Sequence, residues 1–136
     1  MFREPLLRIL AALAVLIALL HITAIVFYLY WTLWWYDMPL HFLGGAFGSL
    51  SVIWTVFFSG YVGNAAPPSV LRLFAIGLVG TLLLGVGWEV FERALGHTWS
   101  IEGYWLDTMT DLFLDMAGGF VGLLLFARYY ATPGAT

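Results

Sequence analysis

The chain has 136 residues, of which 62% are hydrophobic and only 10% are charged, whereas a soluble domain carries about 25% charged residues. This composition excludes a soluble globular protein and predicts an all-α, polytopic integral membrane protein with a single transmembrane domain, residues 1–136. The absence of cysteine excludes disulfides and thiolate ligands, and a net charge of −3 leaves no basic surface for nucleic acid.

Four long apolar stretches are predicted to form a bundle of transmembrane helices, because each has the roughly 20 residues that cross a bilayer. They cover about residues 6–36, 39–59, 69–95 and 106–130. The first has no formal charge from Ile9 to Trp35 and can cross with tilt. It ends in an aromatic cluster that suits a membrane interface, namely Tyr28, Tyr30, Trp31, Trp34, Trp35 and Tyr36.

The arginines predict the orientation of the chain. Four spans place both termini on one side of the membrane, and only Arg93 then falls on the opposite side. The side with the termini holds the other four basic residues, Arg3, Arg8, Arg72 and Arg128. Because positive residues concentrate in cytoplasmic segments, we predict that the N- and C-termini are cytoplasmic.

The fourth span carries an unusual stripe of acidic residues. Asp107, Asp111 and Asp115 are spaced four residues apart, so they share one face of a helix. A charged residue at the centre of a lipid-facing helix costs about 2.5–3.5 kcal/mol. The stripe is therefore expected to face the inside of the bundle.

Two other helices bring polar groups to the same depth, in the outer half of the membrane. Asp37 and His41 begin the second span, and Glu89 and Glu92 end the third; both pairs have spacings that share a helix face. Arg93 and Asp107 are candidate supporting residues. The candidate site comprises Asp37, His41, Glu89, Glu92, Asp111 and Asp115.

So many carboxylates cannot crowd together in ionised form without a counter-charge. The counter-charge is a bound metal, protons, or Arg93. Helix bundles build di-iron and di-manganese sites from similar inward-facing Glu and His residues. Oxygen-rich ligands also suit Mg or Mn, and a mixed set allows Fe or Zn. We predict a divalent metal as cofactor, with Mn, Fe, Zn and Mg as the candidates.

Structural interpretations compete with this one. Asp37 could only cap the second helix, Glu89 and Arg93 could form an intrahelical pair, and Asp107 could only favour the first turn of its helix. For His21, we favour a structural hydrogen bond over a role as a ligand.

Glycines predict where two of the helices touch. Gly44 and Gly48 in the second span, and Gly118 and Gly122 in the fourth, are pairs of small residues four apart that allow close approach of helix backbones. We therefore expect the second and fourth helices to touch, with the polar site above the contact.

The segments YDMPLHFLGG, WEVFERALG and LDTMTDLFLDMAGGFVG resemble the small, uncharacterised bacterial membrane proteins of the YjdF type. More distantly they are similar to VanZ-like proteins, which are linked with glycopeptide resistance. The resemblance covers about residues 36–122 and implies a protein of the bacterial cytoplasmic (inner) membrane. It implies no particular reaction.

Three functions fit these observations. The first is a metal-dependent enzyme that acts on a lipid or envelope precursor through a pocket open to the outer leaflet. The alternative is a small accessory or structural subunit of a larger membrane complex, whose partners are membrane lipids, other membrane subunits or further copies of this chain. An ion or proton path is less favoured, because no acidic groups continue it through the cytoplasmic halves.

Overall fold

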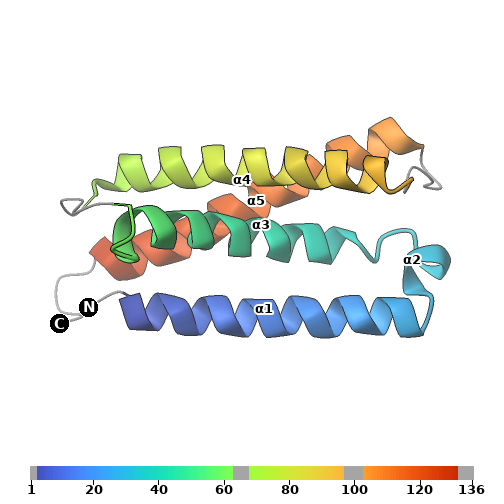
Figure 1. The fold of residues 1–136 in the computed structure, drawn as a ribbon, viewed down its shortest axis with the longest axis horizontal. Coiled ribbons are helices and arrows are strands. Elements are labelled where there is room, and N and C mark those ends of the chain that lie inside the picture. Colours follow the sequence, from blue (N-terminus) through green and yellow to red (C-terminus); the bar gives the residue numbers. More distant parts are fainter. Residues whose placement is uncertain (1–2, 63–67, 97–102, 132–136) are drawn as a thin grey trace.

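The computed structural model describes residues 3–62, 68–96 and 103–131, and all regular structure in these ranges is helical. In chain order, the elements are α1 (Arg3–Val26), α2 (Leu29–Thr32), α3 (Met38–Ile53), the π-helix η1 (Trp54–Phe58), α4 (Val70–Ala94) and α5 (Tyr104–Ala131) (Figure 1). The described residues contain four helical stretches that are long and apolar enough to cross a membrane, Glu4–Val26, Met38–Phe58, Val70–Ala94 and Tyr104–Tyr129. The predicted fold class, an all-α membrane bundle, is confirmed.

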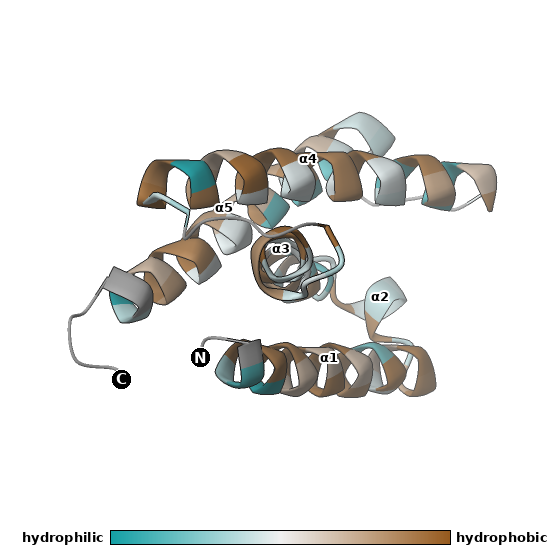
Figure 2. Ribbon diagram, turned by 60° about the vertical axis from the view of Figure 1, so that its left-hand side comes forward, coloured by the Kyte–Doolittle hydropathy of each residue, from teal (hydrophilic) through white to brown (hydrophobic). Residues whose placement is uncertain are grey.

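Helix α3 is the central element. Figure 2 shows it almost end-on, with α1 on one side and α4 and α5 on the other. It packs on all three, most extensively on α5. A Cβ atom on Gly45 would overlap the backbone of Asp115, and one on Gly118 would overlap the carbonyl of Phe42. The backbones of α3 and α5 therefore approach as closely as only glycine permits.

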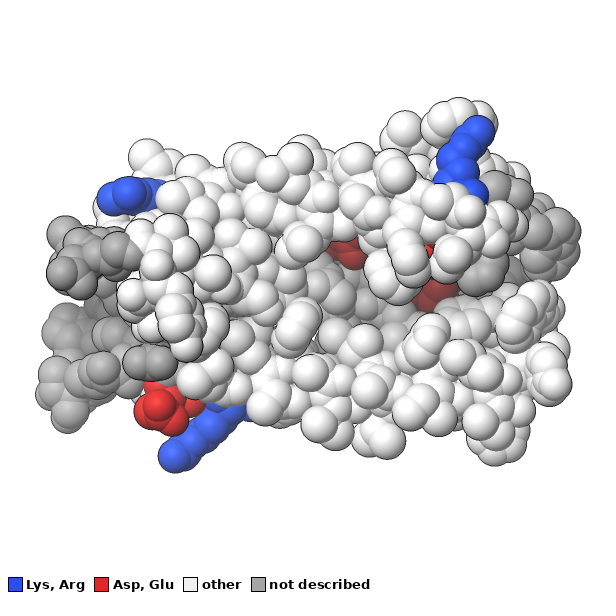
Figure 3. All heavy atoms as spheres, viewed as in Figure 1, with Lys and Arg blue, Asp and Glu red and all other residues white. Residues whose placement is uncertain are grey.

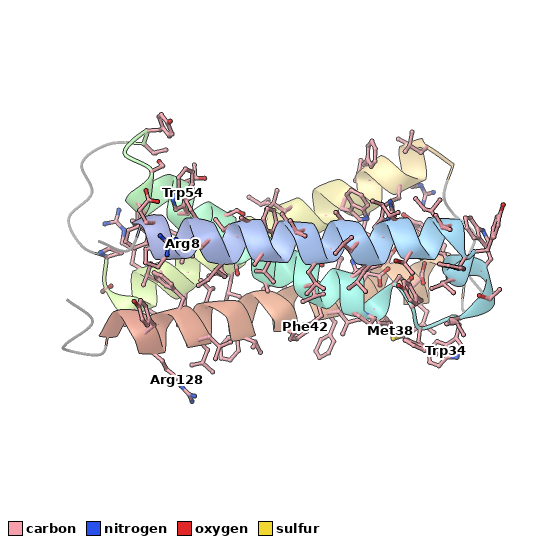
Figure 4. The ribbon with its side chains drawn as sticks, turned by 90° about the horizontal axis from the view of Figure 1, so that it is seen from below. Arg8, Trp34, Met38, Phe42, Trp54 and Arg128 are labelled. Carbon is pink, nitrogen blue, oxygen red and sulfur yellow. The ribbon has the colours of Figure 1, made fainter. Side chains whose placement is uncertain are left out.

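The bundle has two distinct ends. The terminal end holds the start of α1, η1, the start of α4 and the end of α5, and the far end holds α2, the start of α3, the end of α4 and the start of α5 (Figure 1). Arg8 and Arg128 lie at the terminal end, whereas Trp34 and Met38 lie at the far end (Figure 4).

The apolar core fills the half of the bundle next to the terminal end. Ser49 and Thr81 are also buried, but their hydroxyls donate to carbonyls of their own helices, at 3.0 Å to Ala46 and 2.9 Å to Gly77. This half is therefore closed by aliphatic and aromatic packing. Its buried cluster consists of Leu6, Leu10, Leu50, Ile53, Leu73, Leu123 and Phe126.

The structure corrects the predicted first helix, residues 6–36, because α1 already ends at Val26. Tyr28 has a left-handed backbone (φ 55°), after which α2 forms a single turn. The chain then folds back, so that the hydroxyl of Tyr36 donates to the carbonyl of Leu20 at 3.2 Å. Edge-to-face packing of the aromatic rings stabilises this turn, as between Tyr30 and Tyr36, whose centroids lie 6.0 Å apart.

Candidate functional site

Polar side chains from three helices meet in the far half of the bundle. His41 on α3, Glu89 on α4 and Asp111 on α5 each offer a possible ligand atom, and these three atoms lie within 4.8 Å of one another. Glu89 and Asp111 are buried, with 7% and 5% of their surface exposed. The glycine-dependent crossing of α3 and α5 brings His41 and Asp111 together, and α4 supplies Glu89.

The imidazole of His41 lies between two carboxylates. Its Nε2 atom is 3.6 Å from Oδ2 of Asp111, and its Nδ1 atom is 3.4 Å from Oδ1 of Asp115. Asp115 is itself buried, and Gly85 makes room for its carboxylate, since a Cβ atom there would lie 2.6 Å from Oδ2. A Cβ atom on Gly44 would lie 4.0 Å from Oδ1, which is an ordinary contact. The backbone of α4 thus shapes the space around this pair.

The two carboxylate oxygens of Glu89 differ in their hydrogen bonding. The hydroxyl of Thr108 donates to Oε2 at 2.7 Å, whereas Oε1 is buried and has no hydrogen-bond partner in the part of the chain that the structure describes. A buried acceptor without a partner costs about 1–3 kcal/mol, and more when it is charged. This oxygen therefore favours a cation or a proton.

The interpretation of Glu89 and Arg93 as an intrahelical pair is wrong, because no ion pair joins them in the described structure. The guanidinium of Arg93 instead lies over the rings of Tyr104, at 4.8 Å, and Trp105, at 5.7 Å. The counter-charge for the carboxylates is therefore not Arg93.

A second acidic group lies next to the first and shares Asp111 with it. Asp37, Asp107 and Asp111 each offer an oxygen, and the three oxygens lie within 4.8 Å of one another. Asp37 precedes α3, but its side chain makes no capping hydrogen bond, so helix capping does not account for it. Asp107 lies in the first turn of α5, which is also the position expected if it only favours the start of its helix.

Glu92 lies outside both groups, and its charge influences Tyr30 of α2. Tyr30, which lies in α2 between the membrane spans, has its pKa raised to about 12 by burial, with further contributions from Asp37, Tyr36 and Glu92. The hydroxyl of Tyr30 is 2.6 Å from Nδ1 of His21. His21 therefore makes the structural hydrogen bond that the sequence favoured.

The predicted packing glycines occupy different environments. Gly118 faces the carbonyl of Phe42, and a Cβ atom on Gly122 would lie 3.3 Å from an atom of α3. A Cβ atom on Gly48 would instead lie 3.3 Å from Leu84 of α4. The structure thus places Gly118 and Gly122 at the α3–α5 contact and Gly48 against α4.

Residues 1–132 match the model of a family described as "Predicted membrane protein (DUF2238)". The chain belongs to the DUF2238 family. No match is found among curated proteins or solved structures. The family description agrees with the four candidate spans but names no reaction, so the chemistry of this DUF2238 protein has to be inferred from its site.

Thr108 belongs to the site of the DUF2238 protein although the sequence prediction did not include it. It lies three residues before Asp111 and seven before Asp115, so it continues their face of α5. The signal was a hydroxyl next to Asp107 in the segment LDTMTD. This signal was weak, because the hydroxyl of a helical threonine often donates its hydrogen bond to a backbone carbonyl of its own helix.

The site opens sideways from the bundle. Figure 3 shows a hollow between α4 and α1, and Asp and Glu side chains are visible in its depth. The rest of this face is uncharged except near the two ends. A molecule that reaches the carboxylates through this hollow would come from the apolar surroundings of the helices.

The donor set fits a divalent metal. Ligands about 2.0–2.2 Å from a metal ion lie about 3–4 Å apart, so atoms already within 4.8 Å need only a small inward shift. A nitrogen with two carboxylates suits Mn, Fe or Zn, and added oxygens suit Mg. Asp115 occupies the place of the carboxylate that orients a metal-bound histidine through its other nitrogen.

Proposed function

We propose that this DUF2238 protein binds one divalent metal ion through His41, Glu89 and Asp111 and acts on a lipid or lipid-linked envelope precursor. One observation carries the proposal. Three helices bring ligand atoms within 4.8 Å of one another, and one of the ligands, Glu89, has a buried oxygen without a partner in the described chain. Protons alone would leave the purpose of so costly a cluster unexplained.

The residues of the chain have separate roles in this proposal. Asp115 holds the ring of His41 in place through Nδ1, and Thr108 holds Glu89 through Oε2. A carboxylate of the second group, Asp37 or Asp107, serves as general base. The chemistry that a metal held there would supply is polarisation of a phosphoryl or carbonyl oxygen, or activation of water.

The sideways hollow (Figure 3) supports a substrate that arrives from the bilayer. The resemblance to YjdF-type and VanZ-like proteins stays a prediction and names no substrate. We further propose that the termini are cytoplasmic and that the site lies in the outer half of a bacterial inner membrane. The shared end of Arg8 and Arg128 (Figure 4) supports this orientation.

The second candidate is an accessory or structural subunit, and the low burial of α1 favours it. Only 11% of its most apolar window is buried inside the chain, compared with 39% for the last span. Another membrane subunit or a second copy of the chain would cover this surface. A native gel of the gently solubilised protein distinguishes the candidates, because a subunit migrates as a larger assembly.

Asp111→Asn tests the metal site, because the two explanations of the cluster predict opposite signs. If Asp111 binds a metal, the variant loses metal and becomes less stable in added Mn or Zn than the wild type. If the cluster holds only carboxylates and protons, the variant relieves repulsion and becomes more stable. Asn keeps the shape and polarity of the side chain and changes only its charge.

The measurements are elemental analysis of the purified protein and thermal unfolding in detergent, with chelator and with added Mn or Zn. Glu4→Gln is the matched control, since Glu4 is an exposed acid at the terminal end and its loss should not alter metal content. A wild type that is indifferent to chelator and metal, together with a more stable Asp111→Asn, would refute the metal site.

A further inference from the structure

The guanidinium of Arg93 is positioned by aromatic rings rather than by an ion pair. It lies over Tyr104 and Trp105 at the far end of the bundle. Within the described residues, no carboxylate or other acceptor pairs with it. The N–H groups at its edge therefore remain available to a ligand. Arg93 is also the only Lys or Arg residue on the far side of the predicted spans.

This arginine borders a pocket of about 340 Å³ between α4 and α5. Arg93, Tyr104 and Trp105 line its outer part. Glu89 and Thr108 line its inner part, about one helical turn deeper. Arg93 and Glu89 are four residues apart on α4, so about 6 Å of helix axis separates them. The pocket thus joins a cation near the membrane surface to a ligand of the proposed metal site.

We propose that this pocket binds the phosphate headgroup of an anionic membrane phospholipid, with Arg93 as the phosphate ligand. A planar guanidinium matches phosphate oxygens with two parallel hydrogen bonds. Its place among tyrosine and tryptophan at the end of a span is the depth of lipid headgroups. This inference rests on the proposed function and names the substrate class for the same site.

The acids at the inner end of the pocket add a condition. Glu89, with Asp111 behind it, repels a phosphate group, whereas a metal bound between them attracts it. Headgroup binding should therefore be stronger with the metal than after treatment with chelator. Arg93 acts at the outer part of the pocket and should contribute in both conditions.

The test uses the full-length protein in detergent, titrated with phosphatidylglycerol or phosphatidylcholine, and native mass spectrometry counts the bound lipid. Arg93→Gln should weaken phosphatidylglycerol binding about tenfold or more, the usual effect of losing a charge-assisted hydrogen-bonding group. Arg93→Lys keeps the charge without the planar guanidinium, so its affinity for phosphatidylglycerol should lie between those of the wild type and Arg93→Gln. Thermal unfolding of each variant checks that it is folded.

Arg72→Gln is the matched control. Arg72 also lies over an aromatic ring, that of Phe57 at 5.5 Å, but at the terminal end and outside the pocket. This variant should bind phosphatidylglycerol like the wild type. Equal affinities of wild type and Arg93→Gln, or an equal loss in Arg72→Gln, would overturn the inference. Full competition by soluble glycerol phosphate would assign the pocket to a free phosphate ester instead of a lipid.

Metal content measured in the same samples separates this inference from the proposed function. If the wild type holds metal while Arg93→Gln keeps full lipid affinity, the lipid pocket is wrong and the metal site stands. If the wild type holds no metal but its lipid affinity depends on Arg93, the lipid pocket stands and the metal-dependent function fails.

Discussion

The two halves of this bundle use the same helices but are held together differently. Next to the terminal end, aliphatic side chains such as Ile53 and Leu123 are completely or almost completely buried. In the far half, α3 and α5 meet backbone to backbone, and the buried side chains include Glu89, Asp111 and Asp115. Apolar side chains could also face lipid at little cost, whereas ionisable ones could not. The terminal half is thus a scaffold, and the far half is where the sequence departs from what stability alone favours.

Each half contains a buried polar atom without a hydrogen-bond partner among the described residues. In the terminal half it is the indole nitrogen of Trp54, and in the far half it is Oε1 of Glu89. The indole is a neutral donor next to the apolar core, and its loss of a partner is a modest local cost. The Glu89 oxygen lies among other ligand atoms. The surroundings, rather than the missing partner alone, mark the far half as a binding site.

Gly118→Ala should break the far half and have the largest effect. Its Cβ atom would overlap the carbonyl of Phe42, so α3 and α5 would have to separate, at a cost of about 3 kcal/mol or more. Gly87→Ala is the control, because nothing lies within 4 Å of its Cβ position and alanine favours a helix. Thermal unfolding in detergent measures both. Similar melting temperatures for the two variants would show that the close crossing does not exist.

Leu123→Ala tests the terminal half and should have the next largest effect. Leu123 is 1% exposed and packs against Gly77, so its truncation should cost about 2 kcal/mol, the low end of the usual range. The low end applies because lipid replaces water as the reference for apolar groups. Elemental analysis should find unchanged metal content. A variant that loses metal along with stability would contradict the separation of scaffold and site.

The sequence predicted the fold class because apolar length and charge are local properties that need no tertiary information. It also predicted that the acidic residues face inward, since the cost of a charge in lipid does not depend on the partner. It did not predict the end of α1 at Val26. The aromatic run that follows contains no glycine or proline to mark the turn, and the rings that stabilise it meet only in three dimensions.

The exact membership of the site could not be predicted, because the rotation of each helix about its axis was unknown. A shift of one residue turns a side chain by about 100°. Gly45, one position from the predicted Gly44, is therefore the glycine of α3 that lies closest to α5. Glu92 shares a face with Glu89 only loosely, at three residues, and lies outside both ligand groups. When nearly every face of a helix is apolar, the hydrophobic pattern does not set that rotation.

Thr108→Val tests one contact of the far half and should have a smaller effect on stability than Gly118→Ala or Leu123→Ala. The change keeps the shape of the side chain but removes the 2.7 Å hydrogen bond to Glu89, which should cost about 1 kcal/mol. Metal affinity should fall about tenfold, as is usual when a group that holds a ligand is lost. Thr108→Ser restores the hydroxyl and should restore the affinity. Equal metal titrations for Val and Ser variants would mean that the hydrogen bond does not position Glu89.

Tyr30→Phe should have the smallest effect, because it changes the far end outside the spans. The variant loses the hydrogen bond to His21 and should be about 1 kcal/mol less stable at pH 8. The pKa of Tyr30 is raised from 10.0 to about 12 in the folded chain. The neutral phenol therefore contributes stability that is fully present below pH 10 and is lost as the pH rises through 12. The difference in stability between wild type and variant, measured by thermal unfolding, should shrink between pH 10 and 12.

Tyr61→Phe is the control for this prediction. Tyr61 is 81% exposed at the terminal end, so this variant corrects for the direct effect of high pH. A constant difference across this range would show that Tyr30 is not buried beside the acidic residues.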